Sequence, residues 1–326
     1  MKILALSRYP LNAFASIVVL AACSNGGSQP PIGAPNALPQ SRAIPTNAEH
    51  GRSPMPPEAK SGDLLYAALG QADEVDVFSF PQGKLIQTLT GLNYPSGLCS
   101  DSAGNVWIAT FYGNGGRMVE YAHGGTSPAA SLNDPDFYPN GCSVDPSTGD
   151  LAVTNNSYDG PGSLAIYKHA QGRASLYYDV PNLYNYDFCG YDNKGNLFVD
   201  GPGVLAELPK GGTTFTTISV DKGSPGGQVQ WDGQYITFAT QNSSAIYRVK
   251  VSGSTGTVVG VTHLIGVGGQ MNSSWIQGTT TLIPRGMGSE EIGFWKYPAG
   301  GKPFAFLDLE KHSHVHGVTV SLAPSR

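Results

Sequence analysis

Asn140, Asp187 and His316 are side chains of this sequence whose types could support metal chemistry. With Ser96 they stand at matching places ahead of a repeated short strand. Amide and carboxylate oxygens and imidazole nitrogens are ligands of divalent cations such as Ca²⁺ and Zn²⁺. The four positions therefore predict either a cation site or a set of hydrogen-bonding groups, provided that the fold brings the repeats together.

A second candidate metal motif is the alternating series His312, His314 and His316. In an extended chain alternate side chains share one face, roughly 6.5 Å apart. Two histidines at this spacing can share one zinc ion, whereas three along one straight strand can hardly converge on it. The candidate ligands are therefore Asn140, Asp187, His314 and His316, and the alternative is a polar loop that leads into the last strand.

Aromatic side chains accompany these positions in the sequence. Flat faces with a polar tip suit sugar rings or peptide side chains, although most tyrosines in such a fold simply pack between sheets. The candidate ligand contacts are Tyr94, Tyr138, Tyr184, Tyr186 and Trp275.

Three cysteines, Cys99, Cys142 and Cys189, follow the N-terminal segment. An odd number allows at most one pair and leaves one free thiol. Cys142 and Cys189 occupy equivalent places in neighbouring repeats, so a disulfide between them is a candidate if their Cα atoms lie within about 7 Å. Burial of these cysteines as small apolar residues is the alternative.

The elements that must position these residues come from a repeat with a period of roughly 44 residues. Its core is an Asp-to-Gly turn between two β-rich runs, and copies begin at Asp101, Asp145, Asp192 and, in shortened form, Asp232. The aspartate bonds backbone amides of the turn, and the glycine supplies a positive φ. A second hairpin with aromatic-rich strands follows each first one, which predicts four-stranded blades.

About 260 residues at this period give about six blades, so the fold class is all-β, a six-bladed β-propeller of four-stranded antiparallel blades. The C-terminal strand 318–322 is expected to complete the sheet that 64–68 begins. This closure would hide the sheet edges that otherwise invite aggregation.

The segments Tyr94-Pro95-Ser96-Gly97 before Asp101 and Tyr138-Pro139-Asn140-Gly141 before Asp145 resemble NHL-type repeats and the related gluconolactonase, regucalcin and strictosidine-synthase-like propellers. The resemblance implies that the residue between Pro and Gly faces the mouth of the central channel, which places Ser96, Asn140, Asp187 and His316 there. In gluconolactonase-like proteins an Asn and an Asp at two of these places, with a Glu, bind the metal that activates water. Asn140 and Asp187 match, while Glu74, the nearby Glu, lies outside the expected motif.

The N-terminus reads as a secretory signal, because Lys2 and Arg8 precede an apolar run and the pair Ala21-Ala22. The order Leu20-Ala21-Ala22-Cys23 resembles the lipobox of bacterial lipoproteins, which predicts lipidation of Cys23; a plain signal peptide is the alternative. The predicted parts are a signal at 1–22, a lipidated Pro/Ser/Gly-rich spacer at 23–61 and one propeller at 62–326. The product would be exported and anchored to the membrane by its lipid, with the outer membrane or the cell surface favoured.

The net charge of −5 and the lack of a basic stripe argue against nucleic acid as a partner. No nucleophile elbow, zinc-protease helix motif or phosphate loop is present. We therefore expect a monomeric, tethered binding module for a protein or carbohydrate ligand. A metal-dependent lactonase or esterase is the alternative, and a structural role in the cell envelope is a third hypothesis.

Overall fold

The computed structural model describes residues 61–112, 115–134, 138–157, 161–240, 243–268, 271, 273–285, 290–309 and 314–324, all within the unit 51–326. The signal segment, Cys23, the spacer up to residue 60 and His312 lie outside the described residues, so what was expected of them stays a prediction. Within the described ranges, none of the helices has the length and apolar character needed to cross a bilayer.

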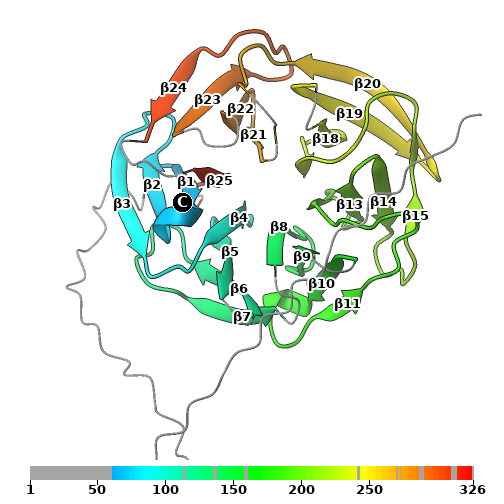
Figure 1. Ribbon diagram of the computed structural model, residues 1–326, viewed down its shortest axis with the longest axis horizontal. Coiled ribbons are helices and arrows are strands. Elements are labelled where there is room, and N and C mark those ends of the chain that lie inside the picture. The colour runs from blue at the N-terminus through cyan, green and yellow to red at the C-terminus, as the bar shows by residue number, and fades with distance from the viewer. Residues whose placement is uncertain are drawn as a thin grey trace, which may run out of the picture. The chain divides into compact units, whose positions relative to one another are not determined.

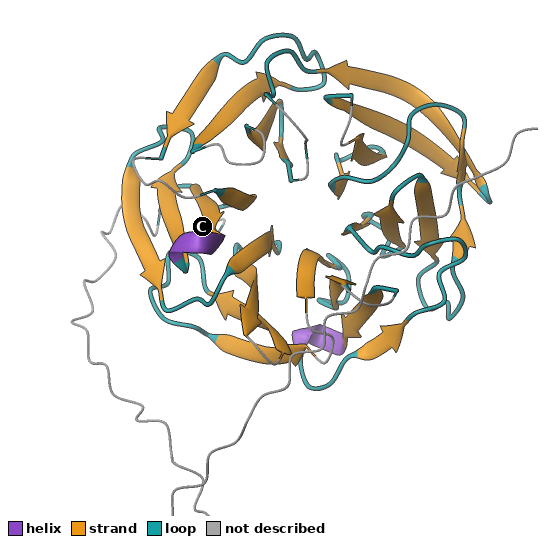
Figure 2. Cartoon of the chain, viewed as in Figure 1, coloured by secondary structure: helices purple, strands orange, loops and turns teal. Residues whose placement is uncertain are grey.

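The described strands form six sheets around a central axis, and the helices are two short 3-10 turns, η2 (Gly70–Ala72) and η3 (Lys168–Ala170) (Figures 1 and 2). We number the sheets as blades and name their strands from the axis outward. Blade 1 contains β25 (Val315–Ser321), β1 (Leu64–Leu69), β2 (Glu74–Ser79) and β3 (Leu85–Thr90). Blade 2 contains β4 (Pro95–Ser100), β5 (Val106–Tyr112), β6 (Gly115–Tyr121) and β7 (Ala130–Asp134). Blade 3 contains β8 (Tyr138–Val144), β9 (Leu151–Asn156), β10 (Ser163–Tyr167) and β11 (Ser175–Tyr177).

The other three blades follow the same plan, with one addition. Blade 4 contains β12 (Phe188–Tyr191), β13 (Leu197–Gly201), β14 (Val204–Leu208) and β15 (Thr216–Thr217). Blade 5 contains β17 (Val229–Trp231), β18 (Ile236–Thr240), β19 (Ala245–Ser252) and β20 (Thr255–His263). Blade 6 contains β21 (Trp275–Gln277), β22 (Thr280–Pro284), β23 (Glu291–Lys296) and β24 (Ala305–Asp308). The predicted six-bladed propeller is confirmed.

Blade 5 departs from the expected four strands because β16 (Ser219–Val220) adds a fifth. This strand pairs in parallel with β20, with Ser219 opposite Thr255. The segment that leads from blade 4 into blade 5 thus runs along the outer edge of β20. It covers the start of the outer edge of β20, at Thr255 and Gly256, where backbone groups would otherwise be unpaired.

The ring closes through its first and last described strands, as expected. β25 pairs antiparallel with β1, with Leu64 opposite Ser321 and Tyr66 opposite Thr319, so the C-terminal strand is the innermost strand of blade 1 (Figure 1). Side chains reinforce the closure: His123 Nδ1 lies 2.6 Å from Ser321 Oγ. The Ala323 amide donates to Asp63 Oδ1 at 2.9 Å.

The turn chemistry inferred from the repeat is also present. Asp101 Oδ1 accepts hydrogen bonds from the amides of Ala103 and Asn105 at 2.9 and 2.8 Å, between β4 and β5. Asp145, Asp192 and Asp232 accept amide bonds in the same way before β9, β13 and β18. Gly104 closes the first of these turns at a φ of 85°, which glycine adopts without steric cost.

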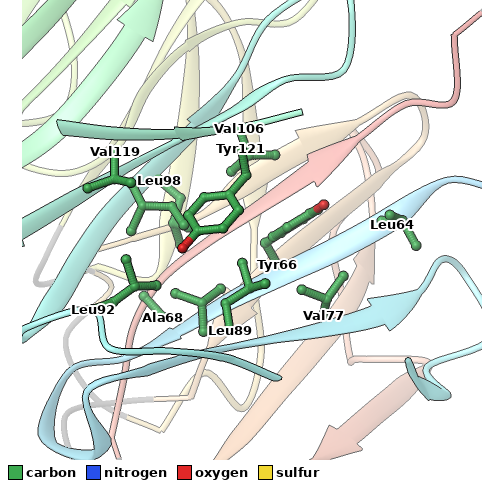
Figure 3. Packing of buried hydrophobic residues seen from close by; sticks show 12 residues of the cluster. Leu64, Tyr66, Ala68, Val77, Leu89, Leu92, Leu98, Val106, Val119 and Tyr121 are labelled. Carbon is green, nitrogen blue, oxygen red and sulfur yellow. The ribbon is translucent and has the colours of Figure 1, made fainter. Parts of the chain in front are cut away.

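Apolar side chains fill the spaces between neighbouring blades. Figure 3 shows Tyr66 of β1 and Tyr121 of β6 among aliphatic residues of blades 1 and 2. Tyr66 is fully buried, and its hydroxyl accepts the Gly124 amide at 3.2 Å. Burying a large apolar side chain contributes about 1.5–3 kcal/mol. The blades are thus held mainly by these interblade layers, and the inner strands stay available to line the channel.

Candidate functional site

The four predicted mouth residues lie on adjacent innermost strands or, for Asp187, directly before one. Ser96, Asn140 and His316 are each followed by a glycine, and a Cβ on this glycine would collide with the neighbouring blade at Gly97 and Gly317 and would be crowded against it at Gly141. A Cβ on Gly317 would lie 2.3 Å from the Ser96 carbonyl oxygen, one on Gly97 1.6 Å from that of Asn140, and one on Gly141 3.1 Å from that of Asp187. The series His316, Ser96, Asn140 and Asp187 therefore runs around one mouth of the channel, strand against strand.

Side-chain bonds add to this contact between inner strands. Ser96 Oγ donates to the Pro139 carbonyl at 2.9 Å, and Asn140 Nδ2 donates to the Asp187 carbonyl at 2.7 Å. Thr154 Oγ1, from the second strand of blade 3, donates to the same Asp187 carbonyl at 3.0 Å. Ser96 and Asn140 thus fix the spacing of β4, β8 and the chain that enters β12, as well as facing the mouth.

A cavity of about 570 Å³, which we call the mouth pocket, opens over blades 1 to 3. Among the described residues, the aromatic rings that line it are those of Tyr94, Phe111, Tyr138 and His316. Its polar side chains are Ser96, Asn140, Asn156 and Ser157. Ligand sites commonly have volumes of roughly 300–1,000 Å³. The pocket therefore contains three of the four predicted mouth residues, while Asp187 is buried beside it.

The rings of the mouth pocket are arranged as a stacked pair and an edge-on pair. The ring centroids of Phe111 and Tyr138 lie 4.5 Å apart with planes at 17°. Those of Tyr94 and His316 lie 5.1 Å apart at 60°. The sequence pattern did not point to Phe111 or Asn156. Both lie where a second strand of a blade, β5 or β9, reaches the mouth, so the end of the run after each Asp-to-Gly turn is the signal that could have found them.

Tyr94 is held in an unusual backbone conformation. Its φ is 44°, in the left-handed region that bulky residues avoid. Its amide donates to Asp73 Oδ1 at 2.8 Å, which fixes the chain just before β4. Non-glycine residues in such conformations cost on the order of 1–3 kcal/mol and cluster at functional sites. The ring of Tyr94 is therefore placed at the pocket by a specific, strained backbone.

The other aromatic candidates lie elsewhere. Tyr184 is 62 % exposed and is not among the residues of the mouth pocket. Tyr186 is fully buried, and its hydroxyl accepts the Val180 amide at 3.2 Å, so it is a core residue. Trp275 lines a smaller cavity of about 90 Å³ beside Cys99 and Cys142, further along the inner strands. Of the five candidate ligand contacts, these three therefore lie outside the mouth pocket, because spacing along a repeat does not distinguish a ring that packs between blades from a ring at the mouth.

The described lining of the mouth pocket contains no Asp, Glu, Lys or Arg. Burial, together with the nearby His314, lowers the pKa of the His316 imidazole, which favours its neutral form at neutral pH. Beside the pocket, burial raises the pKa of Asp187 from 3.8 to about 6. Burial, and next the charge of Asp187, raises the pKa of Asp200 well above its ordinary value.

The structure brings together only some of the ligands that the predicted cation site needs. Asp187 Oδ2 is buried and has no hydrogen-bond partner among the residues that the structure describes, so this oxygen could be a ligand. Among the described residues, however, no group of three or more His, Cys, Asp or Glu side chains could hold a metal ion. Glu74 begins β2 and pairs with Thr90 of the outer strand, and it is not a residue of the mouth pocket. The described residues therefore do not fit the three-ligand metal centre of gluconolactonase-like proteins.

The disulfide differs from the candidate pair. Cys99 of β4 and Cys142 of β8 are joined, with Cα atoms 5.6 Å apart, and Cys189 is a buried free thiol. Cys142 and Cys189 are equivalent, so both sulfurs lie beside the preceding blade, at 3.9 Å from the Trp107 carbonyl and 3.7 Å from that of Ala152. Cys99 stands one residue nearer its turn aspartate, and alternation along a strand turns it the other way. Two equivalent positions cannot face each other, whereas Cys99 and Cys142 do.

Comparison with known proteins supports the fold and no closer relationship. No protein-family model and no curated protein matches the sequence. A chain of the nidogen/laminin complex matches with a TM-score of 0.65 at 12% identity, over 81% of this chain and 100% of that one. A functionally unknown protein from Desulfotomaculum acetoxidans matches with a TM-score of 0.55 at 11% identity, over 79% of this chain and 99% of that one. A protein of unknown function from Bacteroides caccae matches with a TM-score of 0.57 at 11% identity, over 80% of this chain and 99% of that one. At these identities the likeness defines the class, a six-bladed β-propeller.

Proposed function

We propose that this propeller is a binding module that holds its ligand in the mouth pocket. The observation that carries the proposal is the pocket itself. It combines a stacked ring pair, Phe111 and Tyr138, with a further ring, that of Tyr94, which a strained backbone holds in place. One fold serves many functions in propellers, so the proposal depends on this site and not on the fold.

The test is a fluorine NMR screen of small fluorinated aromatic and polar fragments against the full chain and its Tyr138→Ala variant. We expect fragments that bind the full chain and that lose at least about tenfold in affinity in the variant, which corresponds to about 1.4 kcal/mol. Tyr184→Ala, which removes an exposed ring outside the pocket, serves as the matched control and should leave binding unchanged. Fragments that bind the Tyr138→Ala variant as tightly as the full chain would refute the site.

A divalent-metal-dependent hydrolase of the lactonase or esterase class is the second candidate. The observation in its favour is the buried, unpartnered Oδ2 of Asp187 beside Asn140. If Ca²⁺ or Zn²⁺ binds there, addition of either ion should raise the melting temperature of the full chain and not that of Asp187→Asn. Equal melting temperatures with and without the ions would end this alternative.

We further propose that the protein is exported and anchored by lipid on Cys23. The signal pattern and the spacer composition support this location. The Cys99–Cys142 disulfide is also typical of proteins from oxidising compartments. Cells that express the protein should incorporate radiolabelled palmitate into it, and Cys23→Ala should abolish the incorporation; label retained by the variant would contradict the anchor.

A further inference from the structure

We propose that the mouth pocket binds a neutral saccharide, with one sugar ring lying against the wall that Phe111 and Tyr138 form. The inference rests on the proposed function, because it names the ligand class of the same site. Four features of the pocket support it: its rings, its uncharged polar groups, its unsatisfied polar atoms and its size.

The rings supply an apolar surface of the right kind. Phe111 and Tyr138 are stacked within 17° of parallel, so they form one thick slab, and both line the cavity. The C–H faces of a pyranose ring are apolar and flat, and they pack on aromatic faces, while the hydroxyls around the ring remain free for hydrogen bonds. Tyrosine in addition brings a polar tip.

The polar groups around this slab are amides and hydroxyls. Asn140 and Asn156 each carry one acceptor oxygen and two donor hydrogens, and Ser157 carries a hydroxyl. Neighbouring sugar hydroxyls are both donors and acceptors, so planar amides can bond two of them at once. The side-chain nitrogen of Asn140 donates a hydrogen bond to the Asp187 carbonyl, and this bond fixes the orientation of the Asn140 amide at the mouth.

Two lining residues also have polar atoms without a partner. Asn156 Oδ1 and His316 Nε2 are buried and make no hydrogen bond to the described residues. A buried polar atom that lacks a partner costs about 1–3 kcal/mol. A ligand rich in hydroxyls could relieve this cost where side chains adjust to it, whereas a purely apolar ligand could not.

The charge of the lining argues against other ligand classes. Phosphate and carboxylate ligands are held by Arg and Lys, and cationic ligands by Asp and Glu. The described lining has none of these. A volume of about 570 Å³ lies well inside the range for small-molecule ligands, so a short oligosaccharide is the expected occupant.

The experiment is an array of neutral tetrasaccharides built from glucose, xylose, mannose or N-acetylglucosamine, with oligogalacturonate as the charged counterpart, probed with the full chain and followed by calorimetry. We expect at least one neutral tetrasaccharide to bind and oligogalacturonate to bind at least about tenfold more weakly. Tyr138→Ala and Phe111→Ala should each weaken binding about tenfold or more, about 1.4 kcal/mol. Tyr138→Phe, which keeps the ring, and Tyr184→Ala should stay within about threefold.

The outcomes separate this inference from the proposed function. If fluorinated fragments bind in a Tyr138-dependent way but no neutral saccharide does, the pocket is a binding site and the saccharide inference is wrong. A peptide library that binds through Tyr138, with no saccharide binding, reassigns the ligand class to peptide. If saccharide binds but Tyr138→Ala and Phe111→Ala leave it unchanged, the site assignment falls. If neither fragments nor saccharides bind to folded protein, both proposals fall.

Discussion

The mouth pocket depends on single residues whose local conformation is costly. Tyr94 carries its ring to the pocket from a left-handed backbone, and the contact with Asp73 holds it there. The strained conformation lowers the stability of the fold while it places one side chain, which is a pattern found at binding sites. The same logic applies to Asp187, whose Oδ2 is buried without a partner among the described residues.

The strain at Tyr94 predicts a difference between two small replacements. Tyr94→Ala removes the ring and keeps the left-handed conformation, whereas Tyr94→Gly removes the ring and relieves the strain. We expect the glycine variant to be more stable than the alanine variant by about 1 kcal/mol, in denaturant unfolding monitored by circular dichroism. Both should lose ligand. Equal stability of the two would mean that Tyr94 does not adopt the left-handed conformation.

The buried carboxylate of Asp187 predicts a pH dependence. Burial raises its pKa from 3.8 to about 6, so between these values the folded state holds a proton that the unfolded state releases. The stability that protonated Asp187 contributes is therefore present below about pH 4 and is lost as the pH rises through about 6. The stability of Asp187→Asn relative to that of the native chain should therefore rise steadily over this window. The measurement is the unfolding midpoint of both proteins from pH 4 to 7.5.

Asp308→Asn is the control for this effect, since Asp308 is exposed on the outer strand β24. Only a pH trend of Asp187→Asn that exceeds the trend of Asp308→Asn is assigned to the buried carboxylate. A trend for Asp187→Asn no larger than that of the control would show that Asp187 is solvated in the folded protein, which would also weaken the case for a cation there.

At the scale of the elements, the channel depends on how closely the innermost strands approach one another. The glycine that follows Ser96, Asn140 and His316 makes this approach feasible, since its hydrogen leaves room for a carbonyl of the next blade. The glycine of the repeated Pro-x-Gly segment is therefore explained by packing against the next blade. The residue x before it points the other way, toward the mouth.

Gly97→Ala tests this packing. Its Cβ would lie 1.6 Å from the Asn140 carbonyl oxygen, so β4 and β8 must separate, and we expect a loss of about 3 kcal/mol or more in the free energy of unfolding. Gly260→Ala in β20 is the matched control. Its new Cβ would meet only the flexible Arg248 side chain, at 3.5 Å, so stability should stay or rise by up to about 1 kcal/mol. A tolerated Gly97→Ala would contradict the close approach.

The elements were also what the sequence predicted best. The Asp101, Asp145 and Asp192 turns and the closing strand are local or strictly repeated signals, and the structure has them as expected. The strand β16 was not predicted, because two residues in parallel pairing leave no periodic pattern. For the site, the mouth residues follow from the repeat, whereas Phe111 and Asn156 come from second strands whose ends are placed by the three-dimensional ring.

At the scale of the whole propeller, the ring is held by interblade packing, by the β25–β1 closure and by one covalent link between blades 2 and 3. This link joins β4 to β8 a few residues below the mouth pocket, on the same two strands that supply Ser96, Asn140 and Tyr138. The disulfide is therefore placed to keep two walls of the pocket at a fixed spacing.

The choice of disulfide partner can be tested on the whole molecule. Cys99 and Cys142 are separated by 43 residues, and closing a loop of this size stabilises a fold by about 4 kcal/mol through the unfolded chain. Cys99→Ala with Cys142→Ala should lower the free energy of unfolding by about this amount and should make the protein insensitive to reductant. Cys189→Ala should keep the full effect of reductant on the unfolding midpoint, because Cys189 is a free thiol. If Cys189→Ala instead removes the effect, Cys142 pairs with Cys189 and the inner strands of blades 3 and 4, rather than those under the mouth pocket, are the ones held together.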